Sequence, residues 1–140
     1  MTLADVLVGG FTLLCMGLLA VLFTLAKLAI FRFFNFLIDK KIWMHYGIFH
    51  LILIVTFVAA TLLFVSADLR TMILTVYTPI LVAFFIFEAI WFQRSYFSFE
   101  SRPKVVIAMA VANVVNFGLG SAFISIFLAF LLLLGYVIQI

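Results

Sequence analysis

Long apolar runs separated by short polar segments dominate the chain. A transmembrane helix needs about 20 mostly apolar residues at about 1.5 Å each. Four runs meet this requirement, at approximately residues 6–30, 42–65, 71–92 and 105–138. The pattern predicts an all-α, polytopic membrane protein with about four spans and short loops, folded as one transmembrane helical domain over residues 1–140.

The last apolar run is longer than one bilayer crossing requires. Residues 105–140 contain no charge, and one straight helix of this length would measure about 54 Å, against a hydrocarbon core of about 30 Å. Two glycines, Gly118 and Gly120, loosen the helix within residues 116–121. We therefore expect a long span that is bent there, in preference to two half-spans broken at the same place.

Composition and charge support a lipid environment. Hydrophobic residues make up 69% of the chain and charged residues 9%, whereas soluble domains carry about 25% charged residues. There is no soluble basic face for nucleic acid, so membrane lipids are the expected surroundings. The single cysteine, Cys15, excludes an intrachain disulfide framework.

The distribution of Lys and Arg predicts an orientation. The N-terminal residues carry none, residues 31–41 carry three, residues 66–70 carry one and residues 93–104 carry three. Positive charge favours the cytoplasmic or matrix side, so loops 31–41 and 93–104 should face it and the N-terminus should face the opposite side. The start lacks the basic region of a signal peptide and the arginines of a transit peptide, and we expect a bacterial or mitochondrial inner membrane.

Two opposite charges are expected at a similar depth in the membrane. Lys27 lies about one and a half turns before Arg32, and Glu88 lies a similar distance before Arg94. Charged groups inside a membrane are costly and mark candidate functional sites. One interpretation is a proton or ion relay with Glu88 as the carrier. The preferred interpretation is structural: Lys27 extends to the interface, and Glu88 pairs with it or with a partner subunit.

Two histidines begin the second span. His45 and His50 are five residues apart, about 140° around a helix, so they lack the i, i+4 spacing of a helical metal site, and we expect no metal. Residues 47–51, Gly-Ile-Phe-His-Leu, resemble the Gly-Ile-Arg-His-Leu segment of the haem-anchoring subunits of succinate dehydrogenase, without the family's arginine and following aspartate. The resemblance implies an axial haem-ligand role for His50. We favour an aromatic belt that His50 forms with Trp43 and Tyr46 at the interface, with no bound cofactor.

Small and polar residues mark the expected helix contacts. In the last span they recur every four positions, at Ala108, Ala112, Asn116 and Gly120. Such ladders let helices approach closely, and Asn113 or Asn116 can form a hydrogen bond across the contact. We prefer this role for the two amides over a pore lining.

Pro79 interrupts the third span near its middle. Proline removes one backbone donor, so it should kink this helix, and Thr75 and Thr78 are placed to satisfy the freed groups. A kink of this kind more often shapes packing than gates a pathway.

No set of residues predicts a reaction. The loops are too short to hold a nucleotide-binding loop or a nucleophile with its base and oxyanion hole, so we expect no enzyme acting alone. The favoured function is a non-catalytic integral membrane subunit of a larger complex, such as a respiratory-type inner-membrane assembly. Its partners would be other membrane subunits, a hetero-oligomer being favoured over a homo-oligomer. The alternatives are a small oligomeric ion or proton transporter or channel that uses Glu88 and Lys27, and a haem-anchoring subunit.

Overall fold

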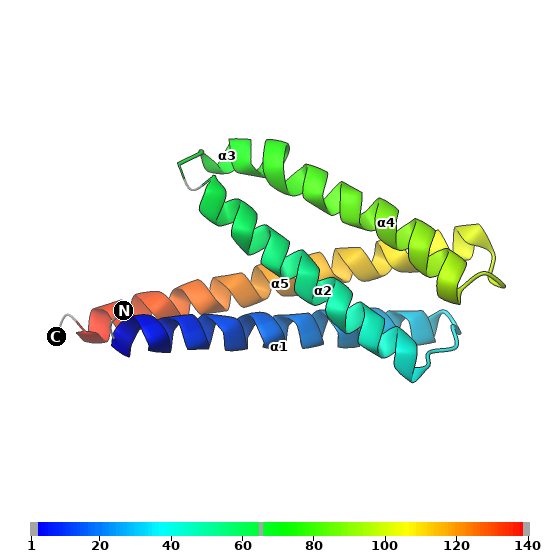
Figure 1. Ribbon diagram of the computed structural model, residues 1–140, viewed down its shortest axis with the longest axis horizontal. Helices are drawn as coiled ribbons and strands as arrows, with labels where there is room; N and C mark the ends of the chain where they lie inside the picture. Colours follow the sequence, from blue (N-terminus) through cyan, green and yellow to red (C-terminus); the bar gives the residue numbers. More distant parts are fainter. Residues whose placement is uncertain (1–2, 65, 139–140) are drawn as a thin grey trace.

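The computed structural model describes residues 3–64 and 66–138, and within them the fold consists of helices joined by short loops (Figure 1). The elements in chain order are α1 (Leu3–Phe33), α2 (Lys40–Leu63), α3 (Leu69–Thr71), the π-helix η1 (Met72–Tyr77), α4 (Thr78–Tyr96) and α5 (Arg102–Ile138). In this described part, four helical stretches are long and apolar enough to cross a membrane: Gly9–Phe33, Lys40–Leu63, Met72–Tyr96 and Arg102–Phe127. The predicted all-α, four-span membrane fold is confirmed.

The turn between α1 and α2 is specified by its own residues. Asn35 adopts a φ of 60°, a left-handed conformation that asparagine tolerates better than most residues. The N–H of Phe36 donates to the carbonyl of Phe31 at 3.0 Å, and the N–H of Asn35 donates to that of Arg32 at 2.9 Å. This is the Schellman pattern, with its usual apolar contact between Phe31 and Phe36. Asp39 then caps α2 by accepting from the N–H of Ile42 at 2.8 Å.

The third span contains a widened turn just before Pro79. The N–H of Thr78 donates to the carbonyl of Ile73, five residues earlier, and the Thr78 hydroxyl donates to the same carbonyl at 2.7 Å. The Thr75 hydroxyl donates to the carbonyl of Thr71 at 2.7 Å. Because proline has no N–H to continue an α-helical ladder, the irregularity predicted at Pro79 takes the form of a π-helical turn immediately before it.

The last span is one uninterrupted helix. α5 continues through residues 116–121, so the long span expected there is present and the less favoured alternative of two half-spans is not. Its ladder of small residues faces inward, with Ala108 and Ala112 fully buried. A Cβ atom placed on Gly120 would lie 2.9 Å from the ring tip of Phe23, because α1 and α5 approach closely there.

The four spans are packed unequally. Figure 1 shows α1 and α5 side by side, whereas α2 and α4 meet them at the end that holds loops 34–39 and 97–101 and diverge toward α3. The main apolar core lies at the packed end and includes Phe31, Tyr46, Phe92 and Met109. Only 6% of the most apolar stretch of the third span is buried inside the chain, compared with 33% for the fourth span. Of the four spans, the third therefore has the smallest share of residues buried inside the chain.

Candidate functional site

An ion pair lies inside the packed end of the bundle. The Nζ of Lys27 on α1 lies 2.6 Å from the Oε1 of Glu88 on α4. The side chains are 0% and 1% exposed, so neither reaches the surroundings. Lys27 therefore does not extend to the interface as the sequence suggested, and its partner belongs to the same chain.

Side chains from the other two spans complete the hydrogen bonds of this pair. Lys27 Nζ also donates to the Oδ1 of Asn113 on α5 at 2.6 Å, and the Nδ2 of Asn113 donates to the Oε2 of Glu88 at 3.1 Å. The Tyr46 hydroxyl on α2 donates to Oε1 of Glu88 at 3.0 Å. We call Lys27, Tyr46, Glu88 and Asn113 the charged tier. Each transmembrane span contributes one member.

The charged tier matches the chemistry that a buried ion pair needs. Both carboxylate oxygens of Glu88 accept hydrogen bonds, one from the ammonium and the tyrosine and the other from the amide. The Lys27 ammonium also lies 5.3 Å from the ring centroid of Tyr46 and 5.7 Å from that of Phe49. Attraction between two ions offsets their desolvation only when further hydrogen bonds satisfy the remaining lone pairs and protons, which is the arrangement here.

A second polar group lies one helical turn farther along the bundle. The Nδ1 of His50 on α2 lies 2.9 Å from the hydroxyl of Thr24 on α1, and this hydroxyl donates to the carbonyl of Ala20 at 2.8 Å. Since the hydroxyl proton is used there, the hydroxyl oxygen accepts from Nδ1–H, and Nε2 of His50 remains an acceptor. The Nδ2 of Asn116 on α5 faces Nε2 at 3.5 Å and donates to the carbonyl of Phe23 at 3.2 Å.

We call Thr24, His50 and Asn116 the histidine tier. One polar atom of this tier lacks a hydrogen bond: the Oδ1 of Asn116 is buried and has no hydrogen-bond partner among the described residues. Turning the amide over would place Oδ1 against the Phe23 carbonyl, so the observed orientation is the better one. The tier thus holds one unused acceptor in an otherwise satisfied group.

Helical spacing explains why the two tiers are stacked. Thr24 and Lys27 are three residues apart on α1, and Asn113 and Asn116 have the same spacing on α5. Residues three or four apart occupy the same face of a helix, one turn from each other. In the part of the chain that the structure describes, hydrogen bonds connect residues within each tier, and none connects one tier to the other.

His45 belongs to neither tier. Its Nδ1 is hydrogen-bonded to the hydroxyl of Tyr96 on α4, and its ring lies beside Trp91. His50 and Tyr46 face the bundle interior at 1% and 0% exposure, so they do not form the interfacial aromatic belt predicted from the sequence. The reason is that their shared face points into the bundle, where Tyr46 contacts Lys27 and Glu88, and His50 contacts Thr24 and Asn116.

The geometry of His50 does not suit an axial haem ligand. Its two ring nitrogens face Thr24 and Asn116, and rings of Phe23, Tyr46 and Phe49 lie within 6 Å of its centroid. Both nitrogens through which an imidazole binds haem iron therefore face side chains of the bundle interior. Among the described residues, no three His, Cys, Asp or Glu side chains lie close enough together to hold a metal.

Two members of the tiers were not singled out as polar site residues in the sequence. Tyr46 was assigned to the interface, and Thr24 was not considered as a partner of His50. Each lies three or four residues from a site residue on the same helix, Tyr46 from His50 and Thr24 from Lys27. Listing the polar residues at this spacing around Lys27 and His50 would have found both.

Comparison with known proteins does not assign the chain to a family. The chain shows no significant match to any known protein family, curated protein or solved structure.

Proposed function

We propose that this protein is a non-catalytic integral membrane subunit of a larger complex, of the kind found in bacterial or mitochondrial inner membranes. The observation that carries the proposal is the exposure of the third span. Large apolar side chains project from α4 away from the chain, with Val82, Ile86, Phe87 and Ile90 each about half exposed. A helix with so little packing inside its own chain is suited to packing against another membrane protein.

The two polar tiers support a structural role for the charges. The members of the charged tier satisfy one another, and the ion pair is sealed from the surroundings. A sealed, neutral pair joins helices, whereas a carrier must exchange its proton or ion with water on each side. On this proposal, the polar groups hold the four spans together and the outer apolar surfaces bind partners.

The first test is purification of the tagged full-length chain in a mild detergent, with native mass determination and identification of everything that comes with it. We expect a stoichiometric set of other membrane proteins. A homogeneous assembly that contains only this chain would overturn the proposal.

Site-specific photo-crosslinking makes the test sharper. A photoreactive residue at Ile86 or Ile90 on α4 should form an adduct with a partner protein in the native membrane. Leu25 on α1 is a matched control because it is 46% exposed, close to the 51% of both α4 positions. Equal adducts at Leu25 would show that α4 is not a specific interface.

A small oligomeric ion or proton transporter is the second candidate. The observation in its favour is an ionisable pair at membrane depth, a feature that pumps and transporters use. Reconstituted vesicles decide between the two: proton or cation flux that is present in the wild type and abolished in a folded Glu88→Gln variant would favour transport. Flux equal to that of protein-free vesicles would disfavour it.

A further inference from the structure

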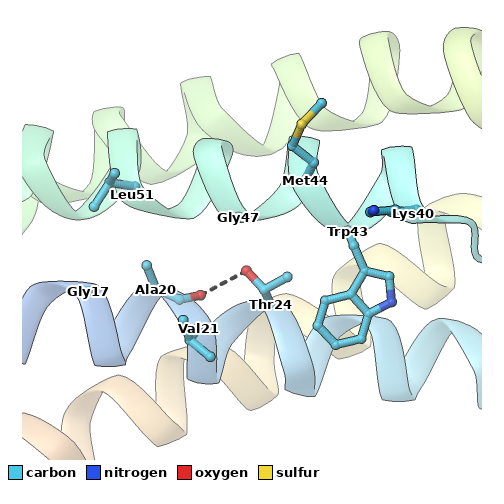
Figure 2. Close-up of a pocket in the computed structure, with 9 residues that line it drawn as sticks. All are labelled: Gly17, Ala20, Val21, Thr24, Lys40, Trp43, Met44, Gly47 and Leu51. Atoms are coloured by element: carbon cyan, nitrogen blue, oxygen red, sulfur yellow. Dashed lines mark hydrogen bonds between the residues drawn. The ribbon is translucent and has the colours of Figure 1, made fainter.

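A groove runs along the outer side of the α1–α2 pair, and Thr24 of the histidine tier forms part of its lining. Its volume is about 490 Å³, within the range of small-molecule ligand pockets, about 300–1,000 Å³. Figure 2 shows one stripe of each helix facing the groove, with Gly17 and Leu51 toward one end and Lys40 and Trp43 toward the other. Apart from Lys40 and the edge of Thr24, the lining is apolar.

Gly17 on α1 and Gly47 on α2 leave space in the groove because neither has a side chain. A Cβ atom added to Gly17 on α1 or to Gly47 on α2 would meet no atom within 4 Å. Gly120, which faces a close helix contact, shows the opposite, because its Cβ would clash with Phe23. The space beside Gly17 and Gly47 is therefore open to an external occupant.

The length and the charge of the groove define that occupant. Its lining on α2 extends from Lys40 to Leu51, about 17 Å at 1.5 Å per residue. This is close to the depth of one leaflet, about half of a 30 Å hydrocarbon core. One exposed ammonium, that of Lys40, lies at the loop end, and among the described residues no carboxylate pairs with it. A transmembrane helix would fill a groove that runs through both leaflets, whereas this lining ends at Leu51 on α2.

We propose that this groove binds one acyl chain of an anionic phospholipid, with the headgroup phosphate on the Lys40 ammonium. The chain lies between Gly17 and Gly47 and ends near Leu51. Trp43, at the loop end, packs against the first methylenes below the headgroup, the depth that tryptophan prefers in membranes. The proposal is independent of the function proposed above.

Fluorescence quenching by brominated lipids tests the proposal, because Trp43 lines the groove. The chain has two tryptophans, so Trp91→Phe leaves Trp43 as the only reporter. The full-length variant is reconstituted in phosphatidylcholine vesicles, and brominated phosphatidylglycerol or brominated phosphatidylcholine is titrated in separately, over the same series of mole fractions. We expect half-maximal quenching of Trp43 at about fivefold less phosphatidylglycerol, which corresponds to about 1 kcal/mol for one basic residue near an anionic surface.

Paired variants separate the charge from the groove. Lys40→Gln should abolish the preference for phosphatidylglycerol, whereas Lys41→Gln, which removes the adjacent lysine outside the groove lining, should keep it. Gly47→Leu should reduce quenching by both lipids, and Gly17→Leu provides the same test from α1. Gly118→Leu is the matched control, because a Cβ there also meets nothing within 4 Å but the residue is not part of the groove.

Three results would overturn the proposal. Equal quenching by the two lipids would remove the anionic preference, and a preference that survives Lys40→Gln would place the phosphate elsewhere. Protection of Trp43 from both lipids would mean that a protein helix, from a second copy or another subunit, covers the groove.

Discussion

The Nζ of Lys27 and the Oε1 of Glu88 lie 2.6 Å apart, although 61 residues separate them along the chain. The bond connects the first span to the third, which of the four spans has the smallest share of buried residues. Asn113 holds both partners and adds the fourth span. The ion pair therefore adds to the apolar packing of Phe92 in fixing the position of α4 at the packed end.

Removing one charge of this pair should destabilise the bundle strongly. In Glu88→Gln, the Lys27 ammonium stays buried without a counter-charge, and such a change costs about 3–5 kcal/mol of unfolding free energy. The measurement is SDS-induced unfolding of the purified protein in mixed micelles. The double variant Lys27→Met, Glu88→Gln removes both charges, so its loss should be smaller than the sum of the two single losses by about 1–3 kcal/mol. Strictly additive losses would show that the two side chains do not interact.

Thr24→Val should weaken the contact between α1 and α2. Valine has a similar shape but no hydroxyl, so Nδ1–H of His50 loses its acceptor inside the bundle. A buried donor left unsatisfied costs about 1–3 kcal/mol, and hydrogen bonds in membrane proteins fall at the low end of such ranges. Thr24→Ser retains the hydroxyl and should stay within about 0.5 kcal/mol of the wild type in the same unfolding titration. Equal losses in the two variants would mean that the methyl group of Thr24, and not its hydrogen bond, matters.

Alanine should have opposite effects at two neighbouring glycines. At Gly120 the new Cβ meets the Phe23 ring tip at 2.9 Å, and this ring packs edge-on against His50, which restricts its movement. Gly120→Ala should therefore cost about 1–3 kcal/mol of unfolding free energy, as overpacking does. Gly118→Ala meets open space, so it should stabilise the helix by up to about 1 kcal/mol.

The cost at Gly120 can be assigned to Phe23 directly. In a Phe23→Leu background the ring tip is absent, so the difference between Gly120→Ala and Gly118→Ala should shrink to that of two ordinary helical positions. If the cost of Gly120→Ala persists in that background, the crowding comes from another neighbour.

Asp68 should titrate below its ordinary range. Its carboxylate accepts from the Thr71 hydroxyl at 2.6 Å and from the Thr71 N–H at 3.0 Å, and these bonds lower the pKa of Asp68 from 3.8. Because the folded-state pKa is depressed, this contribution to stability is fully present above pH 3.8 and is lost as the pH falls through the folded-state pKa. The carboxyl chemical shift of Asp68, followed by NMR in micelles, measures the value. Thr71→Val should raise the pKa toward 3.8, whereas Thr75→Val should leave it unchanged.

Hydropathy was sufficient to predict where the helices lie. The predicted spans 6–30 and 42–65 correspond to α1 (Leu3–Phe33) and α2 (Lys40–Leu63), within a few residues at each end. α1 continues beyond the predicted end at residue 30 and reaches Phe33. The reason is that the turn at Asn35 ends the helix, rather than the loss of apolar character. The sequence could not predict the π-helical turn, because a threonine hydroxyl before a proline can bond to several carbonyls of the preceding turn.

The contents of the site were only partly predictable. Distance from Arg32 and Arg94 placed Lys27 and Glu88 at one depth, because membrane depth follows from position along a helix. The sequence does not specify which helix faces meet, so the partners Asn113 and Tyr46 came only with the structure. Tyr46 was misassigned because a tyrosine near a membrane boundary suits an interface and a buried carboxylate equally well.

The order of synthesis gives the ion pair a further consequence. α1 leaves the ribosome and enters the bilayer before α4 exists, so the ammonium of Lys27 has no carboxylate to meet at that stage. A lysine at the centre of an inserting helix costs about 2.5–3.5 kcal/mol, and the cost is smaller nearer the end of the helix, where Lys27 lies. Among the four candidate spans, the stretch that contains Lys27 has the highest mean hydropathy, and this apolar excess offsets the cost during insertion. Assembly is then ordered. α1 inserts with the Lys27 ammonium unpaired, and α4 packs onto the bundle when Glu88 forms the ion pair.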